Sequence, residues 1–369
     1  MDKGNSISDF FSDLTEPRES NKRHKLIDII TIALCAVICG ADTWEDIEEF
    51  GDTGREWFGR FLELPHGIPG HDTFARVFAS MNPKEFQHAF LEWVKAIQTV
   101  TKRIVAIDGK TLRHSYEKNK SPIHLVSAWA LENKMVLGQV KTREKSNEIK
   151  AIPELLSVLE LGGCIVTIDA MGCQKDIVKT IIGKGADYVL GLKGNQGTLH
   201  EDVKFYFEDC LRSKFKDVDY DYHETVDGDH GRIETRRYWT TSDIEWLPDK
   251  ALWKNLSSIV MVQRERYLNN ATSMETSYYV TSLKSDAECV ARAVRGHWGI
   301  ENSLHWVLDI AFREDECRIR KDNAPANFAI IRHIALNLLR KETSLRRSIR
   351  TKRLKAGWDT DYLGRILRG

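Results

Sequence analysis

The first hundred residues carry apolar side chains at the three- and four-residue spacing of amphipathic helices. One stripe covers residues 26–38, a second begins at Phe74 and a third covers residues 86–97. Asn82-Pro83 separates the last two stripes, and proline is favoured at the first position of a helix. The segment 64–72 between the first and second stripes is rich in turn residues. We therefore predict a helical segment, of the kind that binds DNA, mediates oligomerisation or forms any other all-α domain.

The longest apolar run, Ile29–Ala41, is too short to cross a bilayer, which needs roughly 20 residues. A basic stretch precedes it, so a signal peptide is an alternative. Asp28 and several earlier acidic residues interrupt the basic region that a signal peptide needs. The run is therefore predicted to be a buried helix.

After Lys102, short apolar runs bounded by turn residues replace the helical stripes, which is typical of β-strands. Helical spacing returns twice between these runs. The predicted strands cover residues 104–107, 124–131, 135–140, 164–168 and 188–192, and the predicted helices cover 149–161 and 176–182. The order of three strands, helix, strand, helix, strand indicates an α/β protein with a mixed sheet and helices on its faces.

Residues 198–285 combine three tryptophans and many tyrosines with alternating polar and apolar positions, which predicts an insertion made largely of strands. A long helical pattern then runs from Asp286 to about Ala311, and another covers Pro325–Leu339. We predict four parts: a helical N-terminal domain (1–100), an α/β domain in two pieces (101–197 and 286–340), a β-rich insertion (198–285) and a basic C-terminal tail (341–369).

Composition supports a folded protein. The chain has 369 residues, with 54 Lys and Arg balanced by 54 Asp and Glu, and 42% of the residues are hydrophobic. Such a balance supports a buried core and argues against disorder. The seven cysteines include no C-x-x-C pair, so neither a disulfide framework nor a zinc framework is indicated. A reducing, cytoplasmic location fits best.

The balanced total hides an asymmetry, because residues 1–100 carry a net charge of −7 and residues 310–369 carry +8. Most of the positive excess follows Arg340, and six basic residues crowd between Arg346 and Lys355. A basic segment on a neutral protein indicates a polyanion partner such as nucleic acid, or else a solvated helix face.

Asp108 and Asp169 hold equivalent places, each directly after the apolar run of a predicted central strand. Ligands gather at the carboxyl ends of strands in open α/β sheets, where neighbouring strands would bring the two carboxylates together. Such carboxylates repel one another unless a proton or a cation intervenes, and they suit Mg²⁺ or Mn²⁺. Glu301 is the candidate third acid, because apolar neighbours such as Trp298 and Leu304 predict that it is buried, and a buried Glu without a partner is costly.

Each acid also has an ordinary structural interpretation. An Asp after a strand commonly caps a turn or a helix, and Glu301 could pair with the arginines one or two turns before it. Asp309, two turns after Glu301, is the rival third acid. His297 and His305 lie one turn on either side of Glu301, but as zinc ligands they would need a softer third partner that the sequence does not offer.

Several segments, in this order along the chain, resemble the signature segments of the ISAs-type, H-repeat-associated transposases of bacterial insertion sequences. They are Ala106–Arg113 (AIDGKTLR), Glu144–Glu148 (EKSNE), Thr167–Gln174 (TIDAMGCQ), Lys193–Gln196 (KGNQ), His230–Arg232 (HGR) and His297–Asn302 (HWGIEN). Residues 67–73 are similar to the N-terminal associated domain of that family. The resemblance runs from about residue 8 to residue 365.

This resemblance implies a ribonuclease-H-like catalytic domain of the DDE type, with a β-rich insertion before the helix that carries the Glu. By position, Asp108 is the first acid, Asp169 the second and Glu301 the third, and together they would hold two Mg²⁺ or Mn²⁺ ions. The wider superfamily has Arg one turn before that Glu, where this chain has His297. A Lys often found seven residues after the Glu is replaced here by Leu308.

A second group of residues is predicted to contact DNA. Some lie just beyond strand ends, within reach of phosphates or bases near the acids, and others flank Glu301. Basic residues that alternate along a strand of the insertion either track the DNA backbone or form surface ion pairs. The predicted contacts are Lys110, Lys193, Asn195, Gln196, Arg232, Arg236, His297, Asn302 and His305. The glycine-rich segment 191–197 lacks the Gly-Lys-Ser/Thr ending of a phosphate loop, so no nucleotide cofactor is expected.

The sequence thus predicts a cytoplasmic DDE transposase, which cleaves and joins double-stranded DNA at the terminal inverted repeats of its own element and at target DNA. Because two DNA ends must be held together, we expect a homo-oligomer on DNA. One alternative is a metal-dependent nuclease of the same fold that cuts without joining. The other is a non-catalytic, DNA-binding remnant of an insertion sequence.

Overall fold

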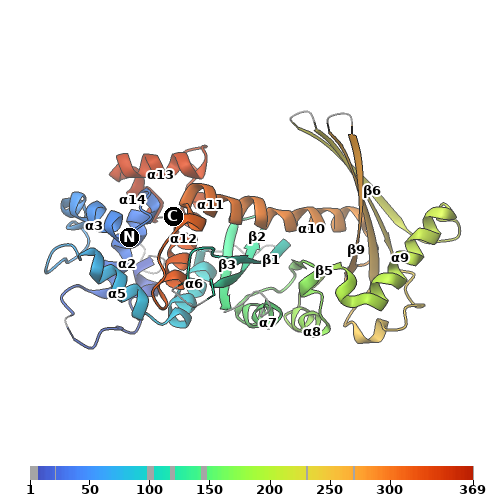
Figure 1. The fold of residues 1–369 in the computed structure, drawn as a ribbon, viewed down its shortest axis with the longest axis horizontal. Coiled ribbons are helices and arrows are strands. Elements are labelled where there is room, and N and C mark those ends of the chain that lie inside the picture. The colour runs from blue at the N-terminus through green and yellow to red at the C-terminus, as the bar shows by residue number, and fades with distance from the viewer. Residues whose placement is uncertain are drawn as a thin grey trace.

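The computed structural model of the protein describes residues 7–20, 22–97, 104–116, 121–142, 148–229, 232–268 and 271–368. The molecule is elongated, with a helical body at one end, an α/β layer in the middle and a blade of long strands at the other end (Figure 1). One nine-stranded mixed sheet runs through the middle layer and into the blade, so the predicted α/β class is confirmed.

The helical body is built from both ends of the chain. The apolar stripes predicted in the first hundred residues correspond to the second, fifth and sixth helices. The N-terminal helices are α1 (Ile7–Phe11), α2 (Leu26–Cys39), α3 (Trp44–Thr53), α4 (Arg55–Phe58), α5 (His71–Ser80) and α6 (Pro83–Ile97). The body is completed by α12 (Ala324–Lys341), α13 (Ile349–Trp358) and α14 (Thr360–Arg368).

Helix α2 lies at the centre of this body, and Ile29 to Ile38 are almost all buried in it, as predicted. It ends because Gly40 adopts a left-handed conformation (φ 117°), which only glycine adopts at little cost. Within the described ranges, no single helix is both long and apolar enough to span a membrane. Helices α2 and α3 pass that test only as a pair, with a 97° bend between them.

The sheet has the strand order β3-β2-β1-β4-β5-β9-β8-β7-β6. Its first five strands match the predicted ones, and two helices, α7 (Glu148–Val158) and α8 (Lys175–Gly183), lie along one face (Figure 1). The five strands are β1 (Ile104–Thr111), β2 (His124–Ala130), β3 (Met135–Thr142), β4 (Ile165–Ile168) and β5 (Asp187–Leu192).

Strand β1 stands where the sheet changes direction. It pairs antiparallel with β2 as far as Thr111, and parallel with β4 only as far as the register pair Ile107 and Ile168. The strand therefore continues past Asp108, whereas the sequence pattern predicts its end at Ile107. Since β4 and β5 are also parallel, the carboxyl ends of three parallel strands meet at one edge of the sheet.

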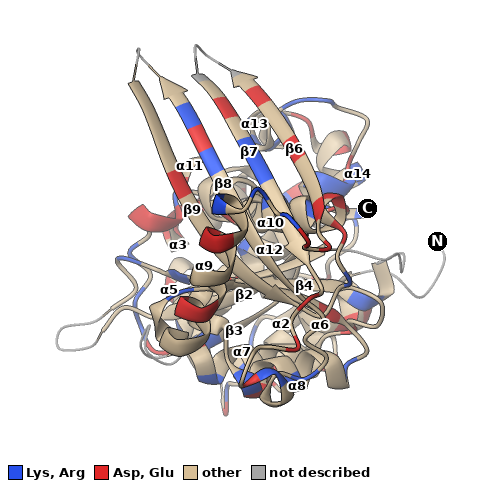
Figure 2. Cartoon of the chain, turned by 90° about the vertical axis from the view of Figure 1, so that its right-hand side faces the viewer, with Lys and Arg blue, Asp and Glu red and all other residues tan. Residues whose placement is uncertain are grey.

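The insertion joins this sheet, because β9 pairs antiparallel with β5. It starts with a helix that the sequence pattern does not predict, α9 (Gly197–Arg212), followed by four antiparallel strands: β6 (Asp221–Asp229), β7 (Arg232–Thr241), β8 (Ser258–Leu268) and β9 (Ala271–Thr281). Lys and Arg alternate with Asp and Glu along these strands (Figure 2), and several pair across them, as Arg264 does with Glu275.

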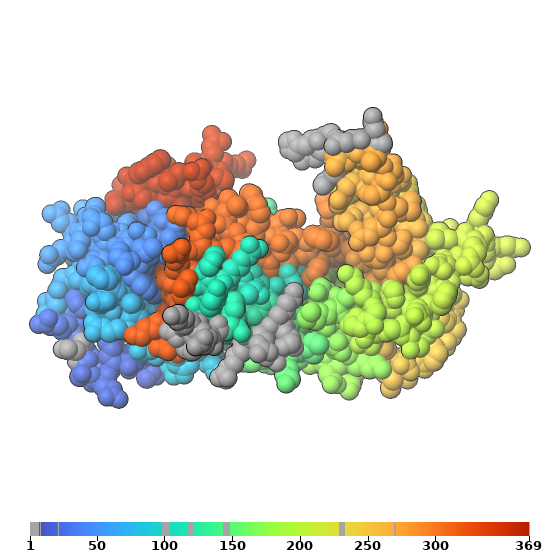
Figure 3. Space-filling model, in the orientation of Figure 1, coloured from blue at the N-terminus to red at the C-terminus, as the bar shows by residue number. Residues whose placement is uncertain are grey.

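A long helical rod returns from the blade to the helical body (Figure 1). It consists of α10 (Ala287–Ile300), a π-helical turn (Glu301–His305) and α11 (Trp306–Phe312). A broad hollow lies above α10, between the C-terminal helices and the blade (Figure 3). At the edge of the sheet, Asn337 of α12 exchanges two hydrogen bonds with the backbone of Val136 in the edge strand β3, at 2.8 and 2.9 Å. The helical body is thereby fixed to the sheet.

The basic C-terminal segment folds into α13 and α14. Lys352 and Arg353 are buried there, and Arg353 donates to the carbonyl of Val37 at the end of α2. Arg346, Arg347 and Arg350 are exposed. Of the six crowded basic residues, two are therefore structural, three are exposed, and Lys355 is half-buried over the ring of Tyr362.

Candidate active site

The two aspartates lie side by side at the edge where parallel strands end. Ile107 of β1 is the register partner of Ile168 of β4, so Asp108 and Asp169 occupy the next positions on neighbouring strands. Asp108 is partly buried, and Asp169 is exposed in the turn that follows β4. The sequence-based expectation that the strands bring these two residues together therefore agrees with the observed register.

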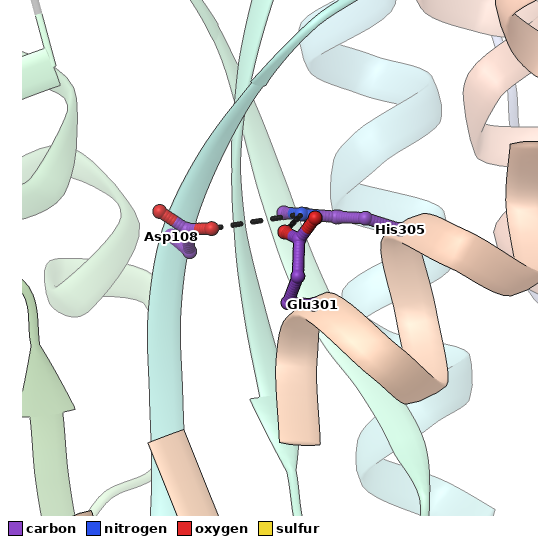
Figure 4. A group of neighbouring side chains, drawn as sticks. All are labelled: Asp108, Glu301 and His305. Atoms are coloured by element: carbon purple, nitrogen blue, oxygen red, sulfur yellow. Dashed lines mark hydrogen bonds and ion pairs between the residues drawn. The ribbon is translucent and has the colours of Figure 1, made fainter. Parts of the chain in front are cut away.

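Glu301 faces Asp108 from the first residue of the π-helical turn, and His305 lies between them from the last residue of that turn (Figure 4). The His305 Nδ1 atom is 3.1 Å from Glu301 Oε2 and 3.5 Å from Asp108 Oδ2. One potential ligand atom from each of the three side chains lies within 4.8 Å of the others. Three residues far apart in sequence thus converge.

Burial and repulsion set the charge of this cluster. Burial, together with the negative charges of Asp169 and Glu301, raises the pKa of Asp108 to about 6, although His305 opposes the shift. A hydrogen bond from His305 lowers the pKa of Glu301. The His305 ring is buried, and its Nε2 atom has no hydrogen-bond partner among the described residues. The cluster thus offers two carboxylates and an imidazole, and its negative charge is not fully balanced by a neighbouring cation. Such a set of ligand atoms fits a divalent cation.

The expected burial of Glu301 is wrong. Its side chain is 57% exposed, and Trp298, one turn earlier, is also exposed. The apolar neighbours Ile300 and Leu304 are buried because they point toward the core on the other side of the rod. Arg295 does not pair with Glu301 but lies 3.3 Å from Asp227 of the blade.

Asp169 caps the turn that follows it. The expectation that an Asp after a strand caps a turn is therefore correct for one of its two carboxylate oxygens. Its Oδ1 accepts hydrogen bonds from the backbone N–H groups of Met171 and Gly172, at 3.0 and 3.3 Å. Both bonds use the same oxygen. Behind it, His297 Nδ1 is 3.2 Å from Thr167 Oγ1, and burial lowers the pKa of His297.

Two of the predicted DNA-contacting residues hold this turn in place. Asn195 donates from Nδ2 to the carbonyl of Ala170 at 2.6 Å, and Gln196 donates to the carbonyl of Cys173 at 3.0 Å. These bonds connect the end of β5 to the turn that carries Asp169. Lys193, two positions earlier than Asn195, is exposed.

Lys110 and the rival acid Asp309 are paired with each other. The Lys110 ammonium contacts Asp309 and lies 2.8 Å from Glu314 Oε2. Burial disfavours the Lys110 ammonium, yet its pKa is raised because Glu314 and Asp309 surround it. Glu314 is itself buried against Lys110 and Arg332, and these cations lower its pKa to about 2. Asp309 therefore belongs to a neighbouring ion-pair network.

The remaining predicted contacts differ in exposure. Arg236 is buried and paired with Glu234 and with Asp227, the latter at 2.7 Å. Asn302 is exposed beside Glu301. Arg232 begins β7, but its side chain lies outside the described part of the structure, as do residues 143–147 and 230–231.

His305 is the residue whose place the sequence does not reveal. It is predicted to contact DNA but lies between Asp108 and Glu301. The sequence offers one signal for this position. His305 follows Glu301 by four residues, and side chains at that spacing are neighbours on the surface of a helix. The apolar pattern of the sequence predicts neither the π-helical turn nor its contact with the partly buried Arg340.

The family described as "Transposase DDE domain" matches residues 100–338. A second family, "DDE_Tnp_1-associated", matches residues 8–94. The chain therefore belongs to the DDE transposases, enzymes that cleave DNA and transfer its strands, and it is a transposase by this membership.

Its curated relatives carry matching names. The chain is 41% identical over 354 residues to the "H repeat-associated putative transposase YhhI" of Escherichia coli K12, covering 94% of this chain and 93% of that protein. It is 42% identical over 370 residues to the "Putative transposase YncI" of Escherichia coli O157:H7, covering 98% of this chain and 94% of that protein. Among solved structures, a piggyBac transposase synaptic complex with hairpin DNA matches with a TM-score of 0.43 and 11% identity, over 98% of this chain and 76% of that one. That likeness is too weak to support an argument.

Proposed function

We propose that this transposase cuts and joins DNA with Asp108, Asp169 and Glu301 as its metal-binding acids, at the ends of its own insertion sequence. The observation that carries the proposal is the convergence of Asp108, Glu301 and His305 within 4.8 Å, beside Asp169 on the neighbouring parallel strand. Phosphodiester chemistry needs negative charge neutralised at the reacting phosphate, and acidic clusters that hold cations provide this.

Two Mg²⁺ or Mn²⁺ ions are the proposed cofactors; when bound, they would activate the attacking hydroxyl and stabilise the leaving oxygen. The charges of both Asp169 and Glu301 act on Asp108, so Asp108 would help to hold the ions together with each of the other two acids. Only one Asp169 oxygen is engaged by backbone N–H groups, which leaves the other for a ligand. The order β3-β2-β1-β4-β5 supports the ribonuclease-H-like core that the family resemblance implies.

The proposed DNA partner would approach the exposed side of these elements. Lys193, which directly follows β5, and Asn302, which follows Glu301 in the chain, are exposed, and they are the predicted DNA contacts that we retain as direct ones. Asn195 and Gln196 would act by holding the Asp169 turn, because their amides are engaged with its backbone. Since two DNA ends must be cut together, we also propose that the enzyme works as a homo-oligomer on DNA.

The test is Asp108→Asn, which keeps the shape of the side chain and removes its charge. We expect Mn²⁺-dependent cleavage and strand transfer at an element end to fall by on the order of 10³-fold, since several kcal/mol of charge stabilisation is lost. DNA binding in a gel-shift assay should persist. A joining assay with pre-cut ends separates a transposase from a nuclease.

The matched control is Asp309→Asn, because Asp309 is already paired with Lys110. This variant should retain cleavage. If Asp108→Asn cleaves at the wild-type rate, or if Asp309→Asn loses cleavage while Glu301→Gln retains it, the proposed set of acids is wrong.

A further inference from the structure

Arg340, in the last turn of α12, is a partly buried cation that contacts the π-helical turn. Its guanidinium donates from Nη2 to the carbonyl of Ser303, the middle residue of that turn. It also stacks over the ring of Trp129, with 4.8 Å between the guanidinium carbon and the ring centroid. Burial lowers the pKa of Arg340 to about 10. No carboxylate of the described residues pairs with it, and its Nε has no hydrogen-bond partner there.

A charge that is partly withdrawn from water and has no counter-charge is costly, so the position of Arg340 calls for an explanation. Packing alone would be served better by an apolar side chain of similar length. What distinguishes Arg340 is the group to which it donates, since that carbonyl lies between Glu301 and His305.

The π-helical turn is itself unusual, because its backbone bonds join residues five apart, as Trp306 N–H does to the carbonyl of Glu301. Such turns are rare and unfavourable compared with α-helix, and they frequently occur at functional sites. The extra residue in the turn changes the direction in which Glu301 and His305 point. Something outside the helix must therefore favour the wide turn over continuous α-helix.

Arg340 also connects the turn to the strand that carries Asp108. Trp129 belongs to β2, and its register partner is Ala106 of β1, two residues before Asp108. The rod passes close to the same ring, because a Cβ at Gly299 would lie 3.9 Å from Trp129 Nε1. One guanidinium thus contacts both sides of the acid cluster, the turn directly and the strand through Trp129.

We propose that Arg340 is a positioning residue for the candidate metal site: it holds the Ser303 carbonyl, keeps the π-helical turn wound and so aims Glu301 and His305 at Asp108. The proposal rests on the metal-binding role given above to Asp108 and Glu301. Residues that orient metal ligands from behind affect metal affinity by about 10- to 100-fold.

The experiment measures Mn²⁺ binding to the purified full chain by the electron paramagnetic resonance signal of the free ion. Arg340→Met keeps the length of the side chain and removes its charge and its donors. Arg340→Lys keeps a donor that can reach the Ser303 carbonyl. The control is Arg353→Met, because Arg353 is a more deeply buried arginine that donates to the carbonyls of Val37 and Ala311 and stacks over Phe312. Its neighbouring acid is Asp42, which is not part of the candidate metal site.

We expect Arg340→Met to weaken Mn²⁺ binding at least about tenfold, without lowering the unfolding temperature, since the buried charge is gone. Arg340→Lys should bind within a few fold of the wild type, and Arg353→Met should bind as the wild type does. Wild-type Mn²⁺ affinity in Arg340→Met, with binding lost in Asp108→Asn, would overturn the positioning role and leave the proposed function standing. Equal weakening in Arg353→Met would also overturn it. If Asp108→Asn binds Mn²⁺ normally, the metal site itself is wrong.

Discussion

In the absence of a divalent cation, the acid cluster should destabilise the folded protein, and Asp108→Asn should relieve this cost. The pKa of Asp108 rises from 3.8 to about 6, and one pKa unit corresponds to 1.36 kcal/mol, so the ionised carboxylate costs the folded state about 3 kcal/mol. A carboxyl whose pKa is raised by folding contributes most below pH 4, and that contribution is lost as the pH rises through 6. Asparagine does not ionise, so the stability of the Asp108→Asn variant does not fall in this way as the pH rises.

The assay is urea unfolding, followed by tryptophan fluorescence with a chelator present, at pH 4 and at pH 7.5. We expect the free energy of unfolding of Asp108→Asn to exceed that of the wild type by about 2–3 kcal/mol at pH 7.5. This difference should shrink toward zero at pH 4. The control is Asp176→Asn, since the Asp176 side chain is 88% exposed and pairs only with Lys179 at the surface. This control should change stability by less than about 0.5 kcal/mol at either pH.

Adding Mn²⁺ should close most of the difference in stability between the two proteins. A ligand that binds only the folded state stabilises it, by about 2.7 kcal/mol at a concentration one hundred times the dissociation constant, and only the wild type should gain this. The reasoning is refuted if Asp108→Asn is less stable than the wild type in chelator at pH 7.5. A difference that does not change with pH would refute it equally.

Two further predictions concern the surroundings of the acids. Gly109→Ala should lower the free energy of unfolding by about 1–3 kcal/mol in the same assay, because the new Cβ would overlap the buried pair of His124 and Glu148. An unchanged free energy would show that this pair moves aside freely. Glu314→Gln should cost about 3–5 kcal/mol at pH 7.5, because Lys110 loses a buried partner. The pKa of Glu314 is lowered to about 2, so its contribution is present above pH 4.5 and is lost as the pH falls toward 2; an unchanged cost at low pH would contradict this.

Much of the central layer is predictable from local pattern, because its strands are buried on both faces and read as continuous apolar runs. The runs that end at Ile107 and Ile168 predict neighbouring strands, and the register places them as partners. Helix α9 is missed although Leu199, Val203, Phe207 and Cys210 are buried at helical spacing, because the aromatic residues and alternating positions of the segment around it favour strands. The end of β1 is missed because pairing with β2 continues after pairing with β4 stops, which depends on a neighbour distant in sequence.

The candidate site divides in the same way. The side-by-side placement of Asp108 and Asp169 follows from two strands and the rule that ligands gather at strand ends. The exposure of Glu301 and the position of His305 do not follow, because both depend on a turn of the rod that departs from α-helical geometry. Apolar residues next to Glu301 suggest burial only if the helix is assumed to be regular and covered on that side.

These two errors have a common physical origin, which also explains how the site is held. A continuous α-helix would be favoured by its own hydrogen bonds, so the wide turn must be stabilised by tertiary contacts. Arg340 supplies one through its bond to the Ser303 carbonyl, and His305 supplies another because its Nδ1 lies 3.5 Å from Asp108 Oδ2 on the sheet. Acids that repel one another also need such support when no cation is bound. The apolar pattern of the rod encodes where it packs, whereas the direction of its acid is encoded by polar residues that lie on other elements.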